Sequence, residues 1–371
     1  MSDRPIRVVT VAGARPNFMK IAPLMREFRS PARQGAFEPT LVHTGQHYDA
    51  QMSESFFEEL DIPKPDVNLE VGSAPHGEQT AQVLSRMEPL LGELQPDALV
   101  VVGDVNSTLA ATLAAVKLLV PVAHVEAGLR SFDRTMPEEI NRLLTDAVAH
   151  WLFTTEPAGA ENLRNEGVPE ERIHFVGNVM IDTLLANLER ARNLDTLERL
   201  GLIPGSYGLL TLHRPSNVDD PEHLRRLFDV LEEIHQELPI VFPVHPRTQQ
   251  VIEKLLDGPA PRLHTTSPLG YLDFLCLMAD AKLVLTDSGG LQEETTALNV
   301  QCLTLRGETE RPVTVTQGTN TIVGFEPDAI RSAARKVLDG EAKPGTMPEG
   351  WDGQAAKRIV DTLQRDLERT L

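Results

Sequence analysis

The chain has 371 residues, and its 35 lysine and arginine residues against 54 aspartate and glutamate residues give a formal net charge of −19. Such an acidic surface disfavours nucleic acids and anionic membranes as partners, but it permits a small anionic ligand where cations gather locally. Hydrophobic residues make up 41% of the chain and charged residues 24%, which excludes wholesale disorder. At this length, the composition predicts two domains of ordinary size.

Strands and helices are expected to alternate along the first half of the chain. Short apolar runs predict buried parallel strands, and amphipathic or proline-started segments between them predict helices. In chain order we expect strands at residues 6–11, 38–43, 98–103, 121–125, 151–154 and 173–176, and helices at 14–28, 79–94, 107–119 and 137–149. This alternation predicts a doubly wound parallel sheet.

A helix over residues 177–193 leads to a second half with the same pattern. Its strands are expected at residues 208–212, 240–244, 283–286, 302–305 and 321–323. We therefore predict an α/β chain of two Rossmann-like domains, residues 1–177 and 178–352. The amphipathic C-terminal helix, residues 353–371, is expected to pack back on one of them.

The cysteines, the N-terminal residues and the longest apolar run together indicate the compartment. Cys276 and Cys302 lie in apolar segments, and we expect them to be buried hydrophobic residues in a reducing compartment. The first residues lead directly into an apolar strand with no secretory signal. The longest apolar run, residues 109–123, contains Lys117 and Pro121 and is too short to span a bilayer. We expect a soluble, cytoplasmic protein.

Residues with reactive or charged side chains follow the predicted strands. In open α/β sheets, ligands bind at the carboxyl ends of the strands, so we expect these side chains to meet at one interdomain cleft. Residues that stand just after a predicted strand are Arg15, Asp104, Glu126, His213, His245 and Ser288. The alternative interpretation of Asp104 is a helix cap, and a lone histidine is more often structural than catalytic.

Two segments predict anion binding. Residues 13–20, GARPNFMK, join a strand to a helix N-terminus and add the cations Arg15 and Lys20, although a structural turn is the alternative. Residues 287–295, DSGGLQEET, let the backbone approach a phosphate, with Ser288 capping the helix. Neither a Walker A loop nor a GxGxxG fingerprint is present, which disfavours a dinucleotide dehydrogenase.

The acidic residues of the second segment have two interpretations. Glu293 and Glu294 either complement the helix dipole in its first turn or hold ribose hydroxyls beside a phosphate site. Arg311 would add a further phosphate cation. No HExxH motif or His/Cys zinc spacing occurs, so no metal is expected. Together with the strand-end carboxylates, these features predict a nucleotide diphosphate ligand with acid–base chemistry beside it.

The order of these motifs resembles a known family. GARPNFMK, GDVNSTLA, HVEAGLR, MPEEINR, LTLHRPSN, VHPRT, DSGGLQEET and TERP occur in this order in the non-hydrolysing UDP-N-acetylglucosamine 2-epimerases, over Gly13 to about Gly324. The resemblance implies the GT-B architecture, with the C-terminal helix packed on the first domain, a UDP-sugar substrate, no metal or nicotinamide cofactor, and a homodimer. It implies interconversion of UDP-N-acetylglucosamine and UDP-N-acetylmannosamine through loss of UDP to 2-acetamidoglucal and its re-addition with inversion at C2.

The resemblance also implies a role for individual residues. The acid–base carboxylates would be Asp104, Glu126 and Glu138, and His213 the catalytic residue on the phosphate side. Substrate binding would fall to the basic Arg15 and Lys20, the pyrophosphate loop Ser288, Gly289 and Gly290, the ribose ligand Glu294, the uracil contact Phe274, and to His245 and Arg311. Arg142, one turn after Glu138, is expected to hold that carboxylate in place, whereas Asp133 and Glu139 are interpreted as structural.

Some residues depart from the family pattern. RPNFMK stands where many relatives have RPEAIK, and HRPSN replaces HRxEN. Asp49 and Glu78 occupy places where members activated by a second UDP-N-acetylglucosamine carry a glutamine and an arginine, so that activation is not implied. The alternatives are a hydrolysing 2-epimerase, a 2-epimerase for a modified UDP-N-acetylhexosamine derivative, a GT-B glycosyltransferase and a non-catalytic nucleotide-sugar sensor.

Overall fold

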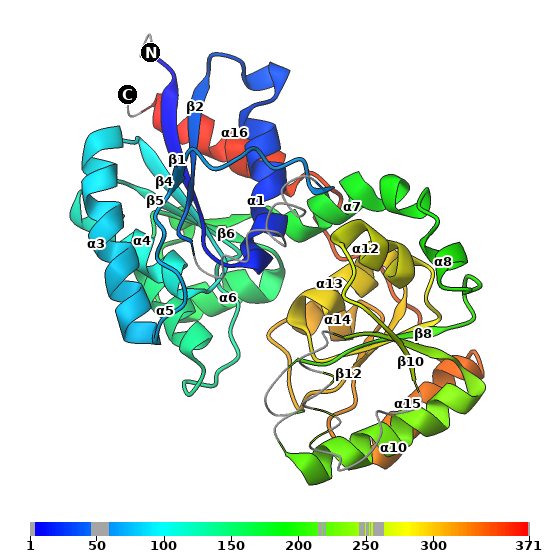
Figure 1. Cartoon of the computed structure of the whole chain (residues 1–371). Coiled ribbons are helices and arrows are strands. Elements are labelled where there is room, and N and C mark those ends of the chain that lie inside the picture. Colours follow the sequence, from blue (N-terminus) through cyan, green and yellow to red (C-terminus); the bar gives the residue numbers. More distant parts are fainter. Residues whose placement is uncertain are drawn as a thin grey trace. The chain divides into compact units, whose positions relative to one another are not determined.

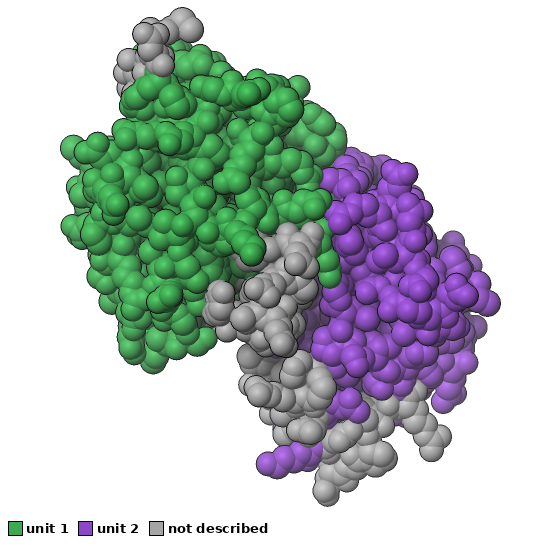
Figure 2. All heavy atoms as spheres, turned by 45° about the horizontal axis from the view of Figure 1, so that its top comes forward, with its two compact units in different colours: residues 1–183, 349–371 green, residues 184–348 purple. Residues whose placement is uncertain are grey.

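The computed structural model describes residues 4–45, 59–213, 220–244 and 263–369, together with residues 217, 249, 252 and 254. The chain divides into two compact units, Met1–Thr183 with Glu349–Leu371 (unit 1) and Leu184–Pro348 (unit 2), coloured separately in Figure 2. The expected division placed these boundaries at 177/178 and 352/353. Each unit is an α/β layer structure around its own parallel sheet, which confirms the predicted fold class.

Unit 1 is built on a seven-stranded parallel sheet with the order β3-β2-β1-β4-β5-β6-β7 (Figure 1). Its strands are β1 (Ile6–Ala12), β2 (Phe37–His43), β3 (Val67–Asn68), β4 (Ala98–Val102), β5 (Val122–Val125), β6 (Trp151–Thr154) and β7 (Ile173–Phe175). Its helices are α1 (Arg15–Phe28), α3 (His76–Leu94), α4 (Asn106–Lys117), α5 (Pro137–Val148), α6 (Pro157–Asn165) and α16 (Ala355–Glu368), and α7 (Val179–Arg192) crosses into unit 2.

Unit 2 repeats this plan with a six-stranded parallel sheet in the order β10-β9-β8-β11-β12-β13. Its strands are β8 (Gly208–Thr211), β9 (Ile240–Pro243), β10 (His264–Thr266), β11 (Leu283–Thr286), β12 (Gln301–Thr304) and β13 (Asn320–Ile322). Its helices are α8 (Thr196–Arg199), α10 (Pro221–Glu237), α12 (Tyr271–Ala279), α13 (Gly289–Leu298), α14 (Pro312–Thr316) and α15 (Pro327–Leu338). Among these, α10 and α15 pack side by side.

The apolar runs form these strands because both faces of each sheet are covered by helices. All five residues of β4 are buried, as a central parallel strand requires. The alanine-rich α4 packs closely between α3 and α5 because alanine side chains allow helices to approach one another. Cys276 and Cys302 are free and buried, as predicted. No helix among the described residues is both long and apolar enough to cross a membrane.

The C-terminal helix α16 packs on α1 in unit 1. Asp182 fixes its first turn by accepting hydrogen bonds from the backbone N–H groups of Ala355 (3.1 Å) and Ala356 (2.8 Å). Burial raises the pKa of Asp182 to about 6. The fully buried Trp351 donates from Nε1 to the carbonyl of Thr155 at 3.0 Å and anchors the segment that precedes the helix.

Candidate functional site

Each sheet has a point where the strand order reverses, and the candidate residues gather at these two points. In unit 1 the reversal lies between β1 and β4, and in unit 2 between β8 and β11. Loops that leave neighbouring strands in opposite directions there open a crevice at the carboxyl edge of the sheet. Gly13 and Asp104 follow the two strands of unit 1, whereas His213 and Ser288 follow those of unit 2. We describe them as two half-sites, one in each unit.

A buried ion pair lies at the carboxyl edge of unit 1. Lys20 Nζ on α1 contacts Glu126 Oε2 at the end of β5, and both residues are buried. Gly103 leaves space for this pair, since a Cβ there would lie 3.0 Å from Lys20 Nζ and 3.5 Å from Glu126 Oε2. Glu126 has a φ of +72°, a conformation that costs about 1–3 kcal/mol in a residue with a side chain. The strained backbone presents this carboxylate to Lys20.

Asn17 organises the loop between β1 and α1, a role that was not predicted. Its Oδ1 accepts the backbone N–H groups of Gly13 and Ala14, both at 3.0 Å, and its Nδ2 donates to the carbonyl of Val102 at 3.1 Å. The amide therefore joins the loop after β1 to the end of β4. An asparagine in the first turn of a helix that follows a strand is the signal that would have pointed to it.

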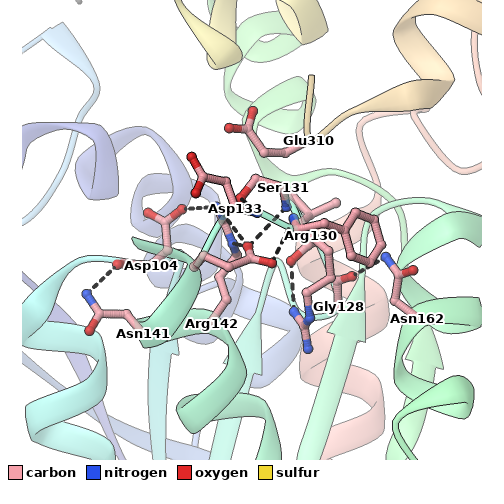
Figure 3. A network of polar contacts seen from close by, with 12 residues as sticks. Asp104, Gly128, Arg130, Ser131, Asp133, Asn141, Arg142, Asn162 and Glu310 are labelled. Carbon is pink, nitrogen blue, oxygen red and sulfur yellow. Dashed lines mark hydrogen bonds and ion pairs between the residues drawn. The ribbon is translucent and has the colours of Figure 1, made fainter. Parts of the chain in front are cut away.

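Asp104 is held by an arginine from α5. Arg142 Nη1 donates to Asp104 Oδ2 at 2.7 Å, as Figure 3 shows, and Asn141 Nδ2 donates to the Asp104 carbonyl at 2.9 Å. The Asp104 side chain is 31% exposed, so one edge of the carboxylate faces solvent. The N-cap of α4 is Val105, so Asp104 is no helix cap. An oriented and partly exposed carboxylate at a strand end can exchange protons with a ligand.

The predicted partner of Arg142 is wrong. The same guanidinium binds Glu139 Oε2 through Nε at 3.0 Å and Nη2 at 2.8 Å, and the described residues include no hydrogen bond or ion pair between Arg142 and Glu138. Glu138 is half-exposed in the first turn of α5 and makes no hydrogen bond or ion pair with any described residue. Its negative charge is favourable at a helix N-terminus, and its carboxylate is accessible to a ligand.

A second buried layer lies beneath these carboxylates. His124 of β5 is fully buried, with Nδ1 2.6 Å from Asp146 Oδ1 and Nε2 2.8 Å from the Gly103 carbonyl. Asp146 Oδ2 accepts the backbone N–H of Gly128 at 3.1 Å and lies 2.8 Å from Arg130 Nη2. Burial alone would raise the pKa of Asp146, but the charges and hydrogen bonds of His124 and Arg130 lower it. This layer fixes the ends of β4 and β5, from which Asp104 and Glu126 project.

A histidine and an aspartate form the centre of the unit 2 half-site. His213 Nδ1 lies 2.7 Å from Asp287 Oδ1, and Asp287 also accepts the His213 backbone N–H at 3.0 Å. The aspartate is fully buried, whereas the His213 side chain is 61% exposed. Asn217 Nδ2 donates to Asp287 Oδ2 at 2.9 Å and completes the support. A carboxylate at Nδ1 fixes the tautomer and the orientation of the ring and leaves Nε2 for a ligand.

Helix α13 begins at this half-site with Gly289 and Gly290. Ser288 occupies the N-cap position, but its side chain makes no capping hydrogen bond, so the predicted cap is wrong; its backbone N–H donates to Thr286 Oγ1 at 2.9 Å. A Cβ at Gly289 would lie 2.7 Å from Arg311 Nη1, so glycine is needed for the guanidinium to lie over the helix start. A cation beside a helix N-terminus is a favourable setting for phosphate.

The acidic residues of α13 lie beyond its first turn, so they do not complement the helix dipole there. Glu294 is buried, and burial together with the charge of Glu293 raises its pKa to about 8. Its Oε1 has no hydrogen-bond partner among the described residues. Glu293 lies 3.1 Å from Arg311 Nε. A neutral carboxylic acid with an unused oxygen is suited to bind a hydroxyl group of a ligand.

Arg311 is shared between two acids. Its Nη1 lies 3.5 Å from Glu310 Oε2, and Glu310 is also held by Arg306 at 2.8 Å. Burial alone would raise the pKa of Glu310, but the two guanidinium groups lower it to about 2.

Phe274 is half-buried on α12.

Two predicted residues cannot be placed in this way. His245 lies outside the described residues, and of Arg15 the structure describes only the backbone, at the start of α1. Within the described ranges, no group of three or more histidine, cysteine, aspartate or glutamate side chains could hold a metal ion.

Comparison with known proteins gives a consistent result. The family model described as UDP-N-acetylglucosamine 2-epimerase matches residues 29–364. The UDP-N-acetylglucosamine 2-epimerase of Methanocaldococcus jannaschii is 41% identical over an alignment of 374 residues, gaps included. The alignment covers 96% of this chain and 99% of that protein. A crystal structure of the M. jannaschii UDP-GlcNAc 2-epimerase in complex with UDP-GlcNAc and UDP has a TM-score of 0.87 at 40% identity, over 97% of this chain and 100% of that chain.

A second relative is described by a different substrate. The UDP-2,3-diacetamido-2,3-dideoxy-D-glucuronate 2-epimerase of Pseudomonas aeruginosa is 42% identical over 364 residues, which cover 97% of this chain and 100% of that protein. A crystal structure of the Neisseria meningitidis UDP-GlcNAc 2-epimerase bound to UDP-GlcNAc has a TM-score of 0.86 at 30% identity, over 97% of this chain and 100% of that chain. These relatives share the epimerised position and differ in the sugar that carries it.

Proposed function

This chain belongs to the UDP-N-acetylglucosamine 2-epimerase family, and we propose that it interconverts UDP-N-acetylglucosamine and UDP-N-acetylmannosamine without hydrolysis. The observation that carries the proposal is a set of three carboxylates from the carboxyl edge of one sheet, each in a different setting. Asp104 is paired with Arg142, Glu126 is paired with Lys20, and Glu138 is accessible without an ion pair among the described residues. Groups with such different settings can take different acid–base roles.

The reaction needs more than one such group. The hydrogen on C2 of the sugar is not next to a carbonyl, so a base alone removes it slowly. When the C1–O bond to UDP breaks, the positive charge that develops at C1 acidifies this hydrogen, and its loss gives 2-acetamidoglucal and UDP. Addition of a proton to the opposite face of C2, with return of UDP to C1, inverts the centre. Proton removal and delivery on opposite faces require separately placed residues.

We assign this proton chemistry to Asp104, Glu126 and Glu138 of unit 1. Lys20 is proposed to hold the Glu126 carboxylate in place and to add positive charge near the phosphate side of the substrate. Arg142 is proposed to orient Asp104 through the hydrogen bond at 2.7 Å. These assignments rest on the positions of the residues at the ends of β4 and β5 and in the first turn of α5, and on the family motifs GDVNSTLA, HVEAGLR and MPEEINR.

We assign the UDP moiety to the half-site of unit 2. The negative charge that UDP gains on departure would be stabilised by the N-terminus of α13 at Ser288, Gly289 and Gly290, and by Arg311 over Gly289. His213, oriented by Asp287, is proposed as the proton donor or hydrogen-bond donor to the departing diphosphate. By family resemblance, further contacts come from Glu294 to the ribose, from Phe274 to the uracil, and from Arg15 to the phosphate side. His245 is proposed as a further substrate contact because it follows a strand of unit 2.

A modified UDP-N-acetylhexosamine is the second candidate substrate. The specific observation in its favour is the 42% identity to the P. aeruginosa enzyme described as acting on a 2,3-diacetamido-glucuronate sugar. The C2 chemistry is the same for both sugars, so the carboxylates do not discriminate between them. The comparison of kcat/KM for the two UDP-sugars decides the substrate.

We also propose that the enzyme is a cytoplasmic homodimer that serves the synthesis of cell-surface polysaccharide. Cys276 and Cys302 are free thiols, as is usual in a reducing compartment. The outward face of α5 carries Ile140, Leu144 and Val148, which are 38%, 47% and 38% exposed and one helical turn apart. Such an apolar stripe supports burial against a second copy. The nucleotide-sugar product supports the biosynthetic role.

Incubation with UDP-N-acetylglucosamine in D₂O tests the proposal. We expect NMR to show deuterium at C2 and an equilibrium mixture of two UDP-sugars. Asp104→Asn and Glu126→Gln should each lower the exchange rate at least ~100-fold while UDP binding, measured by calorimetry, survives. Asp97→Asn is a matched control, because Asp97 binds Arg4 at 2.7 Å and lies at the other end of β4.

Each other outcome selects an alternative. Free N-acetylmannosamine as the main product would indicate a hydrolysing epimerase, and sugar transfer to an acceptor without C2 exchange would indicate a glycosyltransferase. UDP-sugar binding with neither reaction would indicate a sensor. Wild-type exchange rates in Asp104→Asn or Glu126→Gln would remove that residue from the mechanism.

A further inference from the structure

Glu139, the residue after the accessible Glu138, has a set of contacts that the proposed mechanism has not used. Its side chain is 2% exposed, and both carboxylate oxygens accept hydrogen bonds. Oε2 accepts from the Ser131 backbone N–H at 3.0 Å and from two nitrogens of Arg142, and Oε1 accepts from the Phe132 backbone N–H at 3.0 Å. The carboxylate therefore joins α5 to the loop that leaves β5.

The arginine that Glu139 holds is the one that reaches Asp104. Arg142 uses Nε and Nη2 for Glu139 and Nη1 for Asp104, so one planar guanidinium connects the two carboxylates. Figure 3 shows Arg142 between Asp104 and the Ser131 end of the loop. Because the guanidinium is rigid, fixing two of its nitrogens fixes the position of the third. The side chains of Arg142 and Glu139 are 5% and 2% exposed, whereas that of Asp104 is 31% exposed.

Electrostatics keep the Glu139 carboxylate ionised. Burial alone would raise the pKa of Glu139, but the Ser131 N–H and the Arg142 guanidinium lower it below its usual value. With Glu139 ionised, its negative charge offsets the positive charge of Arg142, so the pair behind the exposed Asp104 carboxylate carries no net charge.

We infer that Glu139 is a positioning residue for epimerisation, which fixes the Arg142 guanidinium and through it the Asp104 carboxylate. The inference rests on the proposed function, because Asp104 matters only if its carboxylate meets the substrate. If the role of Glu139 were purely structural, only its hydrogen bonds to the backbone N–H groups of Ser131 and Phe132 would matter. Phe132 has a φ of +61° and is 78% exposed, so this loop does need support. The two roles predict different kinetics.

Glu139→Gln separates them, because it keeps the size and one acceptor oxygen but removes the charge that holds Arg142. We expect kcat to fall ~10–100-fold, the usual cost of losing a residue that orients a catalytic group. KM and the Kd for UDP should stay within about threefold, because Glu139 makes no hydrogen bond or ion pair with the described residues assigned to UDP. In an Arg142→Lys background, the guanidinium that connects Glu139 to Asp104 is absent. There Glu139→Gln should lower kcat by less than about threefold, since the effects of substitutions at contacting residues are not additive.

Asp97→Asn is the matched control for stability, since Asp97 also combines an arginine fork with a backbone N–H, that of Arg7 at 2.8 Å. It should lower Tm without lowering kcat. If Glu139→Gln has wild-type kcat, or if its loss is the same in the Arg142→Lys background, the inference is overturned. Should Glu139→Gln not fold, Arg142→Lys alone must lose kcat by the same ~10–100-fold at unchanged UDP affinity. Absence of C2 exchange in the wild type would instead overturn the proposed function and the inference with it.

Discussion

The buried Glu294 makes a quantitative prediction about stability. Its carboxyl group has a pKa raised to about 8 by burial and by the charge of Glu293, against a usual value of 4.5. Between these values the folded protein keeps the proton and the unfolded chain has lost it. The unfolded state therefore binds fewer protons, and stability falls as pH rises from about 4.5 to about 8. Glu294→Gln removes this group while keeping its shape.

The size of the effect follows from proton linkage. One pH unit within the window corresponds to about 1.4 kcal/mol for one proton. Between pH 5.5 and pH 7.5, Glu294 should therefore cost the wild type roughly 2–3 kcal/mol of unfolding free energy that Glu294→Gln does not lose. The difference between the two proteins at the two pH values isolates this group, because all other titrating groups are common to both.

The assay must report on unit 2, where Glu294 lies. Hydrogen exchange of the β11 amides in urea, followed by mass spectrometry, measures unfolding of that sheet. The two tryptophans, Trp151 and Trp351, both belong to unit 1, so their fluorescence provides an internal reference that should show no such difference. Glu341→Gln, an exposed carboxylate of unit 2, is the matched control. A wild-type-to-mutant difference that is independent of pH would show that Glu294 is ionised in the folded protein, and would refute the reasoning.

Two further substitutions test the remaining features. Asp287→Asn should lower kcat ~10–100-fold, because His213 loses the carboxylate 2.7 Å from Nδ1 that orients its ring. The control Asp273→Asn, which breaks a contact with Arg199, should leave kcat unchanged. Equal kcat in both variants would contradict the role of Asp287. Leu144→Glu, which places a charge on the apolar stripe of α5, should convert a dimer into monomers in analytical ultracentrifugation, and an unchanged mass would place the interface elsewhere.

The fold could be predicted largely because its strands are buried on both faces. A run such as Ala98–Val102 has no polar position, and this pattern distinguishes a central parallel strand from other segments. The edge strands β3 (Val67–Asn68) and β10 (His264–Thr266) were not predicted, because they are short and mostly exposed. Their sequences carry no apolar run, and only pairing with β2 and β9 makes them strands.

The candidate site was predictable where it depends on strand ends. Asp104 and Glu126 follow buried strands directly, so their place at the carboxyl edge could be inferred from chain order. The residues that support them could not be found in this way. His124 and Asp146 come from β5 and α5, and their contact depends on how that helix packs on the sheet. Pairing across such distances is a property of the folded state, and no local pattern in the sequence records it.

The choice between Glu138 and Glu139 shows the limit of local rules most clearly. Glu138 and Glu139 lie four and three positions before Arg142, so helical spacing allows either carboxylate to meet the guanidinium. Each such pair on a helix surface is worth only about 0.2–0.5 kcal/mol. Glu139 has in addition the backbone N–H groups of Ser131 and Phe132, and hydrogen bonds to a charged group contribute about 1.5–3 kcal/mol each. These contacts outweigh the local preference, so α5 turns Glu139 and Arg142 inward. Glu138 is thereby left accessible, which is the condition for its proposed contact with the sugar.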